Sequence, residues 1–298
     1  MKSMKATNLK SWPIGKPISL RNLTCAFCGH AMAPGTRTRD HFIGRRFVPK
    51  RKPLGQTNLT VYAHRQCNLE KADLEGEFSA LSLHLLASST SRTIDTALSK
   101  DIARKDSGAI STRTRRAVRD SYEHDRVKIQ VMRGVTASFR FTAPPQADSQ
   151  RAFCLARLHV LAFFHWLTFD PVTRRGGFPL GGFCPIMISP VSDWGNAVQR
   201  SLMMTVASWK TRLAFIGAEG FFKIAIRRHP AWECWSWAVE WNQSYRIIGL
   251  FGDPSAAQSI LDTLPSLPMT ELPADAAPFR RYRVERRLDQ TDDILFSP

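Results

Sequence analysis

Two short pairs of cysteine and histidine residues constrain this chain more than any other feature of its sequence. Cys25 and Cys28 form a C-x-x-C pair, and His64 and Cys67 form an H-x-x-C pair further along the chain. Four such ligands in two pairs are what a closed tetrahedral zinc site requires, since each spacing lets a turn bring two ligands onto one ion. The sequence therefore predicts a structural zinc ion at these four residues. His30 is a competing ligand that ranks lower, because His64 completes the second pair.

The remaining cysteines do not indicate a disulfide framework. Cys154, Cys184 and Cys234 are scattered among apolar residues. The first residues carry charge but lack the apolar stretch of a secretory signal. The most apolar segment, 152–169, is interrupted by Arg157 and two histidines, so it does not read as a membrane span. We therefore expect a protein of the reducing cytoplasm, without membrane contact.

The chain is strongly basic. It has 42 Lys and Arg against 25 Asp and Glu in 298 residues, a formal net charge of +17. Residues 1–120 hold 22 of the basic residues and only 9 of the acidic ones, so the excess lies in the half that contains the Cys and His pairs. A field of this sign favours polyanions. DNA is the expected partner, with its phosphates near the zinc-binding part of the chain.

Length and patterning predict an α+β protein with two domains and a connector. Residues 1–22 read as a basic N-terminal extension, and residues 23–80 hold the zinc-bound module. Residues 81–125 read as a basic helical connector. Residues 126–298 are expected to form a C-terminal α+β domain of unrecognised type.

Periodicity gives an outline of that C-terminal domain. It predicts a hairpin across Gly134, a buried helix and four later strands, with a short helix from Pro254. The helix is expected over 150–169, and the strands over 183–188, 221–226, 234–241 and 245–251. Alternating tryptophans in the third of these strands are more typical of a buried strand face than of base stacking.

Between and beside the two Cys and His pairs lies a second set of residues. Asp40 and His41 are adjacent, Asn58 precedes the second pair, Asn68 directly follows it, and Lys71 comes three residues later. An imidazole titrates near neutral pH and suits a general base, whereas carboxylate and amide oxygens suit a hard divalent cation. In this order and inside a zinc frame, the first eighty or so residues resemble the HNH nuclease family. The third position is Asn rather than His, which makes an H-N-N variant.

The resemblance implies a ββα unit with a catalytic Mg²⁺ or Mn²⁺ ion in addition to the structural Zn²⁺. It assigns His41 as the general base, Asp40 and Asn68 as ligands of the catalytic ion, and Asn58 as the residue that orients the base. Lys71 lies one helical turn after Asn68 and would face the same phosphate. The implied reaction hydrolyses a DNA phosphodiester bond to 5′-phosphate and 3′-hydroxyl ends. A single site would nick one strand.

A basic loop between His41 and Asn58 is expected to contact the DNA backbone. The nucleic-acid-binding candidates are Arg45, Arg46, Lys50, Arg51, Lys52 and Arg65. A solvated, charged loop is the plainer alternative.

Taken singly, each of these residues has an ordinary explanation, such as a surface histidine or a helix cap. Two other functions therefore stay open: a non-catalytic zinc module that binds nucleic acid or recruits a partner, and an RNA nuclease. By analogy, the expected context is anti-phage defence, restriction or a mobile element, with a defence-system protein complex as one kind of partner. Oligomeric state, cleavage specificity and the role of residues 126–298 are left open.

Overall fold

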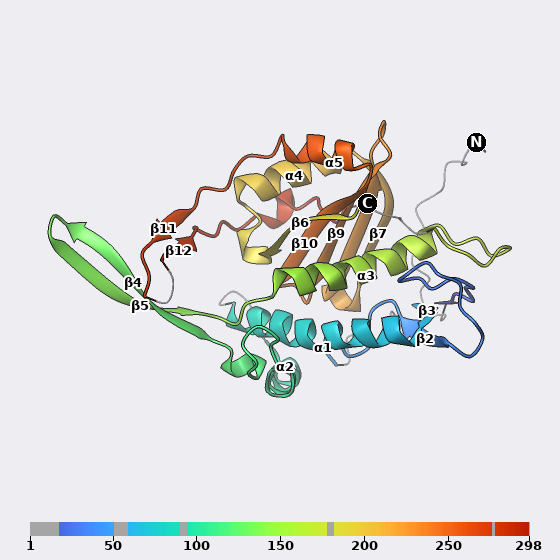
Figure 1. The fold of residues 1–298 in the computed structure, drawn as a ribbon, viewed down its shortest axis with the longest axis horizontal. Coiled ribbons are helices and arrows are strands. Elements are labelled where there is room, and N and C mark those ends of the chain that lie inside the picture. Colours follow the sequence, from blue (N-terminus) through green and yellow to red (C-terminus); the bar gives the residue numbers. More distant parts are fainter. Residues whose placement is uncertain (1–17, 51–58, 90–93, 178–181, 276–277, 298) are drawn as a thin grey trace.

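A computed structural model describes residues 18–50, 59–89, 94–177, 182–275 and 278–297. Within these ranges the chain has an α+β fold, as the sequence predicts. Two long helices, α1 (Arg65–Ser88) and α3 (Ser149–Leu167), run side by side, and α3 lies next to a larger C-terminal sheet (Figure 1).

The N-terminal part is built on a small sheet with the strand order β1–β3–β2. Its strands are β1 (Ile18–Ser19), β2 (Arg37–His41) and β3 (Leu59–His64). β2 and β3 are antiparallel, and β3 leads directly into α1, which gives a β-β-α order. The side chain of buried Asn22 bonds the backbone of Tyr62 in both directions. Residues 18–22 of the expected N-terminal extension therefore belong to this sheet and its edge.

The segment after the first helix contains a further helix and a hairpin. α1 runs through residue 81, where the connector was expected to begin, without a break. It is followed by α2 (Thr96–Gly108) and a short 3-10 helix, Val118–Asp120. The expected hairpin consists of β4 (Glu123–Met132) and β5 (Val135–Ala143), and it projects from the rest of the molecule (Figure 1).

The C-terminal sheet has five antiparallel strands in the order β6–β10–β9–β8–β7. They are β6 (Cys184–Pro190), β7 (Lys210–Gly217), β8 (Phe222–Arg228), β9 (Cys234–Trp241) and β10 (Tyr245–Gly252). The remaining elements are α4 (Ala197–Ala207), α5 (Pro254–Leu261), β11 (Thr270–Leu272), β12 (Arg280–Tyr282) and the 3-10 helices Val191–Asp193, Ala218–Gly220 and Gln290–Asp292.

Sequence patterns located most of this sheet but missed two neighbouring elements. The expected strands correspond to β6, β8, β9 and β10, and α5 begins at the expected Pro254. Neither α4 nor β7 was predicted. Residues 198–216 contain no Gly or Pro, so neither of the strongest turn signals separates the helix from the strand.

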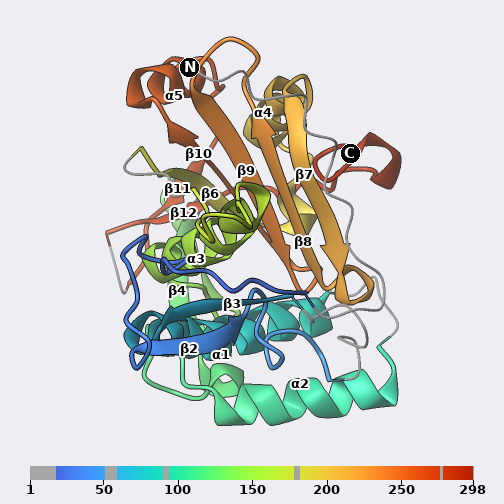
Figure 2. The ribbon, with the colours of Figure 1, turned by 90° about the vertical axis from the view of Figure 1, so that its right-hand side faces the viewer.

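Both faces of the C-terminal sheet are covered. α3 lies on one face (Figure 2), where it packs on residues such as Val239 and Ile247. α4 and α5 pack on the residues that alternate with these, such as Ala238 and Ile248. Because successive strand residues point to opposite faces, this covering explains why the strands carry buried apolar residues on both faces.

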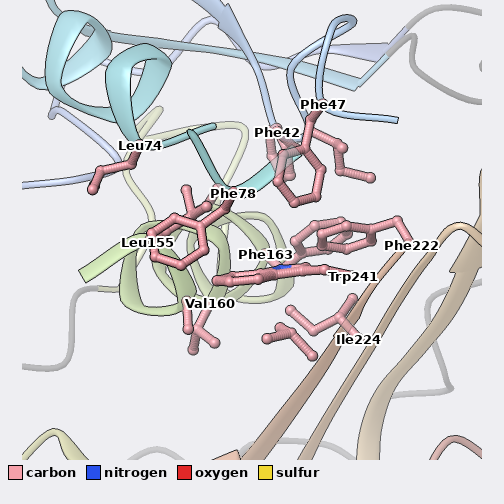
Figure 3. Packing of buried hydrophobic residues seen from close by; sticks show 14 of the residues in the cluster. Phe42, Phe47, Leu74, Phe78, Leu155, Val160, Phe163, Phe222, Ile224 and Trp241 are labelled. Carbon is pink, nitrogen blue, oxygen red and sulfur yellow. The ribbon is translucent and has the colours of Figure 1, made fainter. Parts of the chain in front are cut away.

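One hydrophobic core joins the N-terminal part to this sheet, with members from Leu20 to Phe251. Figure 3 shows Phe47 and Phe78, from the N-terminal part, close to Trp241 of β9. The ring centroids of Phe47 and Phe78 lie 5.7 and 5.5 Å from that of Trp241. Burial of side chains of this size contributes roughly 1.5–3 kcal/mol each. The expected domain boundaries therefore divide residues that share one core.

The apolar segment that α3 occupies is thus a core helix. Among the described residues, neither α3 nor any other helix is long and apolar enough to cross a bilayer.

His165 of α3 gives the fold a pH dependence. Its ring is buried, and burial lowers its pKa from 6.5 to about 4. Below pH 6.5 the unfolded chain takes up a proton that the folded chain does not, so stability falls as pH drops from 6.5 towards 4, by at most about 3 kcal/mol. In urea unfolding between pH 7 and 5, His165→Gln is expected to lose less stability with pH than the wild type. His229→Gln is the control, and equal pH slopes in all three proteins would contradict the prediction.

Candidate metal centre and adjoining pocket

The two Cys and His pairs come together at one end of the N-terminal sheet. Cys25 and Cys28 lie in a tight turn before β2, in which Gly29 has a positive φ of 75° and its N–H donates to the Cys25 carbonyl. His64 ends β3, and Cys67 lies in the first turn of α1. The four ligands thus come from a turn, the end of a strand and the start of a helix.

The geometry suits a tetrahedral metal ion. The four ligand atoms all lie within 4.8 Å of one another, and Cys28 Sγ is 3.3 Å from His64 Nδ1. Sulfur ligands of one tetrahedral zinc ion are about 3.8 Å apart, given a Zn–S bond of about 2.3 Å. The group can therefore hold a metal such as zinc, as the spacing predicts. His30, the competing ligand, is exposed and does not belong to the group.

The protonated thiols are poor metal ligands, and a bound cation is needed to stabilise their negatively charged thiolate forms. Burial, together with the neighbouring thiols of Cys25 and Cys28, raises the pKa of Cys67 to about 12. Burial also raises the pKa of Cys28. A divalent cation stabilises the thiolate forms, so metal binding by this group releases protons and is favoured by rising pH.

A pocket of about 630 Å³ opens beside β2, at the opposite end of this strand from the metal centre. It is lined by Arg39, Asp40, His41, Gly44, Arg45, Arg46, Phe47, Thr60, Ala72, Glu75 and Gly76. Asp40 and His41 end β2, where they pair with Val61 and Thr60 of β3. Two carboxylates, an imidazole and three guanidinium groups thus line one hollow.

Lys71 of α1 is fully buried behind this pocket. Its ammonium donates to the His41 carbonyl at 2.8 Å and lies 3.1 Å from Asp40 Oδ2 and 2.9 Å from Glu75 Oε1. Burial would lower the pKa of Lys71, but the two carboxylates outweigh burial and raise it. Lys71 is therefore a buried cation that holds the end of β2, and its ammonium faces carboxylates instead of solvent.

Glu75 connects this lysine to the C-terminal half. Its Oε1 accepts hydrogen bonds from the Gly44 N–H at 2.8 Å and from His159 Nε2 of α3 at 3.0 Å. Burial alone would raise the pKa of Glu75, but Lys71 and these donors lower it to about 2. Burial lowers the pKa of His159, so a neutral imidazole donates from Nε2. A Cβ at Gly44 would lie 2.0 Å from Glu75 Oε2, so any other residue here would displace the Glu75 carboxylate.

Other expected site residues lie near the pocket or outside the described ranges. Asn68 does not line the pocket; its Nδ2 donates to Thr38 Oγ1 at 3.2 Å, on β2. Arg45 and Arg46 line the pocket, whereas Lys50 and Arg65 are exposed away from it. Asn58, Arg51 and Lys52 lie outside the described residues.

The residues found only in the structure are Arg39, Glu75 and His159. Glu75 follows Lys71 by four residues on a predicted helix, and this spacing could have indicated an ion pair. His159 lies 84 residues further along, and no local pattern connects it to Glu75.

The pocket lining contains two carboxylates, Asp40 and Glu75, and the Lys71 ammonium lies within 3.1 Å of an oxygen of each. Mg²⁺ commonly keeps several waters and uses one or two protein carboxylates together with substrate phosphate oxygens. Asp40 supplies one such carboxylate beside His41. Among the described Cys, His, Asp and Glu side chains, the Cys₃His group is the one cluster of three or more that is close enough for a single ion.

Comparisons with models of protein families, with curated proteins and with solved structures find no match. The structure itself defines an α+β protein with a Cys₃His group that can hold a metal such as zinc.

Proposed function

We propose that this protein is a metal-dependent endonuclease of the HNH type that hydrolyses phosphodiester bonds in DNA. The observation that carries the proposal is the hairpin and helix formed by β2, β3 and α1. This unit bears a Cys₃His group at one end and brings Asp40 and His41 to an arginine-lined pocket at the other. An HNH-type nuclease also agrees with the order of Asp40, His41 and the Cys and His pairs in the sequence.

The residues have separable roles. His41, whose backbone carbonyl is held by Lys71, takes the proton of the attacking water. Asp40 would hold a Mg²⁺ or Mn²⁺ ion, which would stabilise the charge that develops on the phosphate and the leaving oxygen. Asn68, the second ligand expected from the sequence, lies outside the pocket and bonds Thr38, so it has no part in this site. Arg39, Arg45 and Arg46 bind the phosphate backbone. The products carry 5′-phosphate and 3′-hydroxyl ends.

Lys71 was expected to contact the phosphate, but it is buried and has a different role in this proposal. Lys71 neutralises Asp40 and Glu75 and fixes the strand end that carries His41. It is a positioning residue in this proposal. The Cys₃His group likewise has a structural role, because a metal bound there would connect the start of α1 to the turn before β2.

The test is cleavage of supercoiled plasmid with Mg²⁺ or Mn²⁺. Wild type is expected to produce nicked circles, and His41→Ala to reduce the rate by about 10²–10⁴-fold, the usual contribution of a general base. His229→Ala, in the loop after β8, is the matched control and should cut like wild type. Equal circular dichroism spectra of the three proteins would show that the fold is retained.

Two outcomes would contradict the proposal. If wild type binds DNA but cuts with neither ion, a non-catalytic zinc module explains the chain better. If it cuts RNA but leaves DNA intact in parallel reactions, the substrate assignment is wrong while the site assignment stands.

A further inference from the structure

We propose that the β4–β5 hairpin is a DNA-binding arm, whose basic face binds the phosphate backbone of a duplex that extends from the pocket. The proposal rests on the proposed function, which identifies the polyanion as DNA. It gives a role to an element that neither the metal centre nor the pocket uses.

The hairpin is a two-stranded ribbon that extends beyond the body of the protein (Figure 1). The C-terminal strands support its base: Asp125 pairs with Arg280 at 2.8 Å, and the Phe141 ring lies 4.9 Å from that of Tyr282. Beyond the base, residues 129–136 are all exposed. A two-stranded ribbon by itself is only marginally stable in water, so a ribbon of this kind needs a partner surface.

The register of the two strands puts like charges together. Arg126 of β4 lies directly opposite Arg140 of β5, and both are exposed. Lys128 follows on the same face, two residues along from Arg126, but its ammonium is paired with Asp275 at 2.8 Å, so among the described residues the unpaired charges are those of the two arginines. Like charges directly opposite each other destabilise a hairpin. A bound polyanion removes this repulsion, whereas a neutral partner leaves it in place.

The composition of the ribbon favours DNA over a second copy of the chain. Residues 126–142 include four Lys or Arg and no Asp or Glu, and a second copy would bring the same net charge of +17. The opposite face exposes apolar residues such as Ile129 and Phe139, at 38% and 53%. The major groove of DNA admits a two-stranded ribbon, and apolar side chains can contact thymine methyl groups there.

Helix α1 runs from the pocket towards the base of this arm. A second hollow of about 490 Å³ shares Arg46 with the pocket, and its other two arginines are ion-paired, Arg104 with Asp101 and Arg151 with Asp73 and Glu77. At the hairpin base, Tyr122 Oη lies 3.0 Å from His84 Nε2 of α1. Lys71 and His84 are about 20 Å apart along α1. A bound duplex would therefore reach the base of the arm roughly six base pairs from the cut.

Binding to a labelled duplex of about 30 base pairs, followed by fluorescence anisotropy over a series of salt concentrations, tests the arm. His41→Ala serves as the background so that the DNA stays intact. Adding Arg126→Gln with Arg140→Gln is expected to weaken binding on the order of tenfold and to reduce the slope of log K against log salt by roughly 1.8. Arg200→Gln with Lys210→Gln, on α4 and β7, removes the same charge elsewhere and should change neither quantity by as much.

The arm and the nuclease proposal fail separately. If the Arg126 and Arg140 variant matches the charge control in affinity and in slope, the arm does not bind DNA, whatever the plasmid assay shows. If Ile129→Thr with Phe139→Thr instead converts a dimer to a monomer in sedimentation, and DNA affinity stays unchanged in the arginine variant, the ribbon is a protein interface. Thermal melting should show the arginine variant no less stable than wild type, because it loses a repulsion.

Discussion

Replacing Cys67 with serine is expected to release the bound metal and to destabilise the N-terminal part of the chain more than any other single change. Cys67 lies in the first turn of α1 and, with Cys25, Cys28 and His64, connects that helix to the turn before β2. Structural zinc contributes about 10–16 kcal/mol of apparent binding free energy in small zinc-bound modules. This is comparable to the whole stability of a typical domain, about 5–15 kcal/mol.

Metal content by mass spectrometry and thermal unfolding by circular dichroism measure the effect. Wild type should contain one zinc per chain, and Cys67→Ser much less, with a broad transition at lower temperature. Cys154→Ser is the control, because Cys154 is exposed on α3 and far from the other thiols in sequence. A Cys67→Ser protein that kept one zinc and the wild-type transition would show that the ligand assignment is wrong.

Replacing Lys71 with methionine is expected to lower the free energy of unfolding by about 3–5 kcal/mol, the usual cost of removing one partner from a buried ion pair. Methionine has a similar length but no charge. It would leave the carboxylates of Asp40 and Glu75 close together without their shared cation, and the His41 carbonyl without its donor. Urea unfolding at pH 7 measures the loss.

A matched control and a second variant make this test specific. Lys100→Met removes an exposed lysine from α2 and should change stability by less than about 0.5 kcal/mol. Adding Glu75→Gln to Lys71→Met should recover part of the loss, since it removes one of the two unpaired charges. If Lys71→Met unfolded at the wild-type urea concentration, the network would not stabilise the end of β2.

The network also shows why the pocket was only partly predictable. Asp40, His41 and Lys71 were found from their order between and beside the Cys and His pairs, and this order reflects a local unit of two strands and a helix. Lys71 was expected to face phosphate, yet its side chain is buried against Asp40 and Glu75. Burial depends on what covers a helix face, and here the strand end at Asp40 and His41 and the ring of Phe27 lie against the lysine.

The same contrast holds for the C-terminal half. Strands with alternating or continuous apolar residues, such as β9 and β10, were found because their pattern repeats every two residues or ends at a turn. α4 and β7 were not found, because no Gly or Pro separates them. The hairpin at Gly134 was predicted, but the opposition of Arg126 and Arg140 depends on the strand register, which becomes known only when the strands pair.

The sequence by itself determined the metal-binding group, because C-x-x-C and H-x-x-C spacings place ligands through local turns wherever the two pairs meet. It also determined the strand end that carries Asp40 and His41, and the basic character of the chain. Only the tertiary structure decided that Lys71 is a buried cation and that Glu75 and His159 belong with it. Those contacts join residues up to 84 positions apart, and they form only when the shared core of α1, α3 and the sheet excludes water from them.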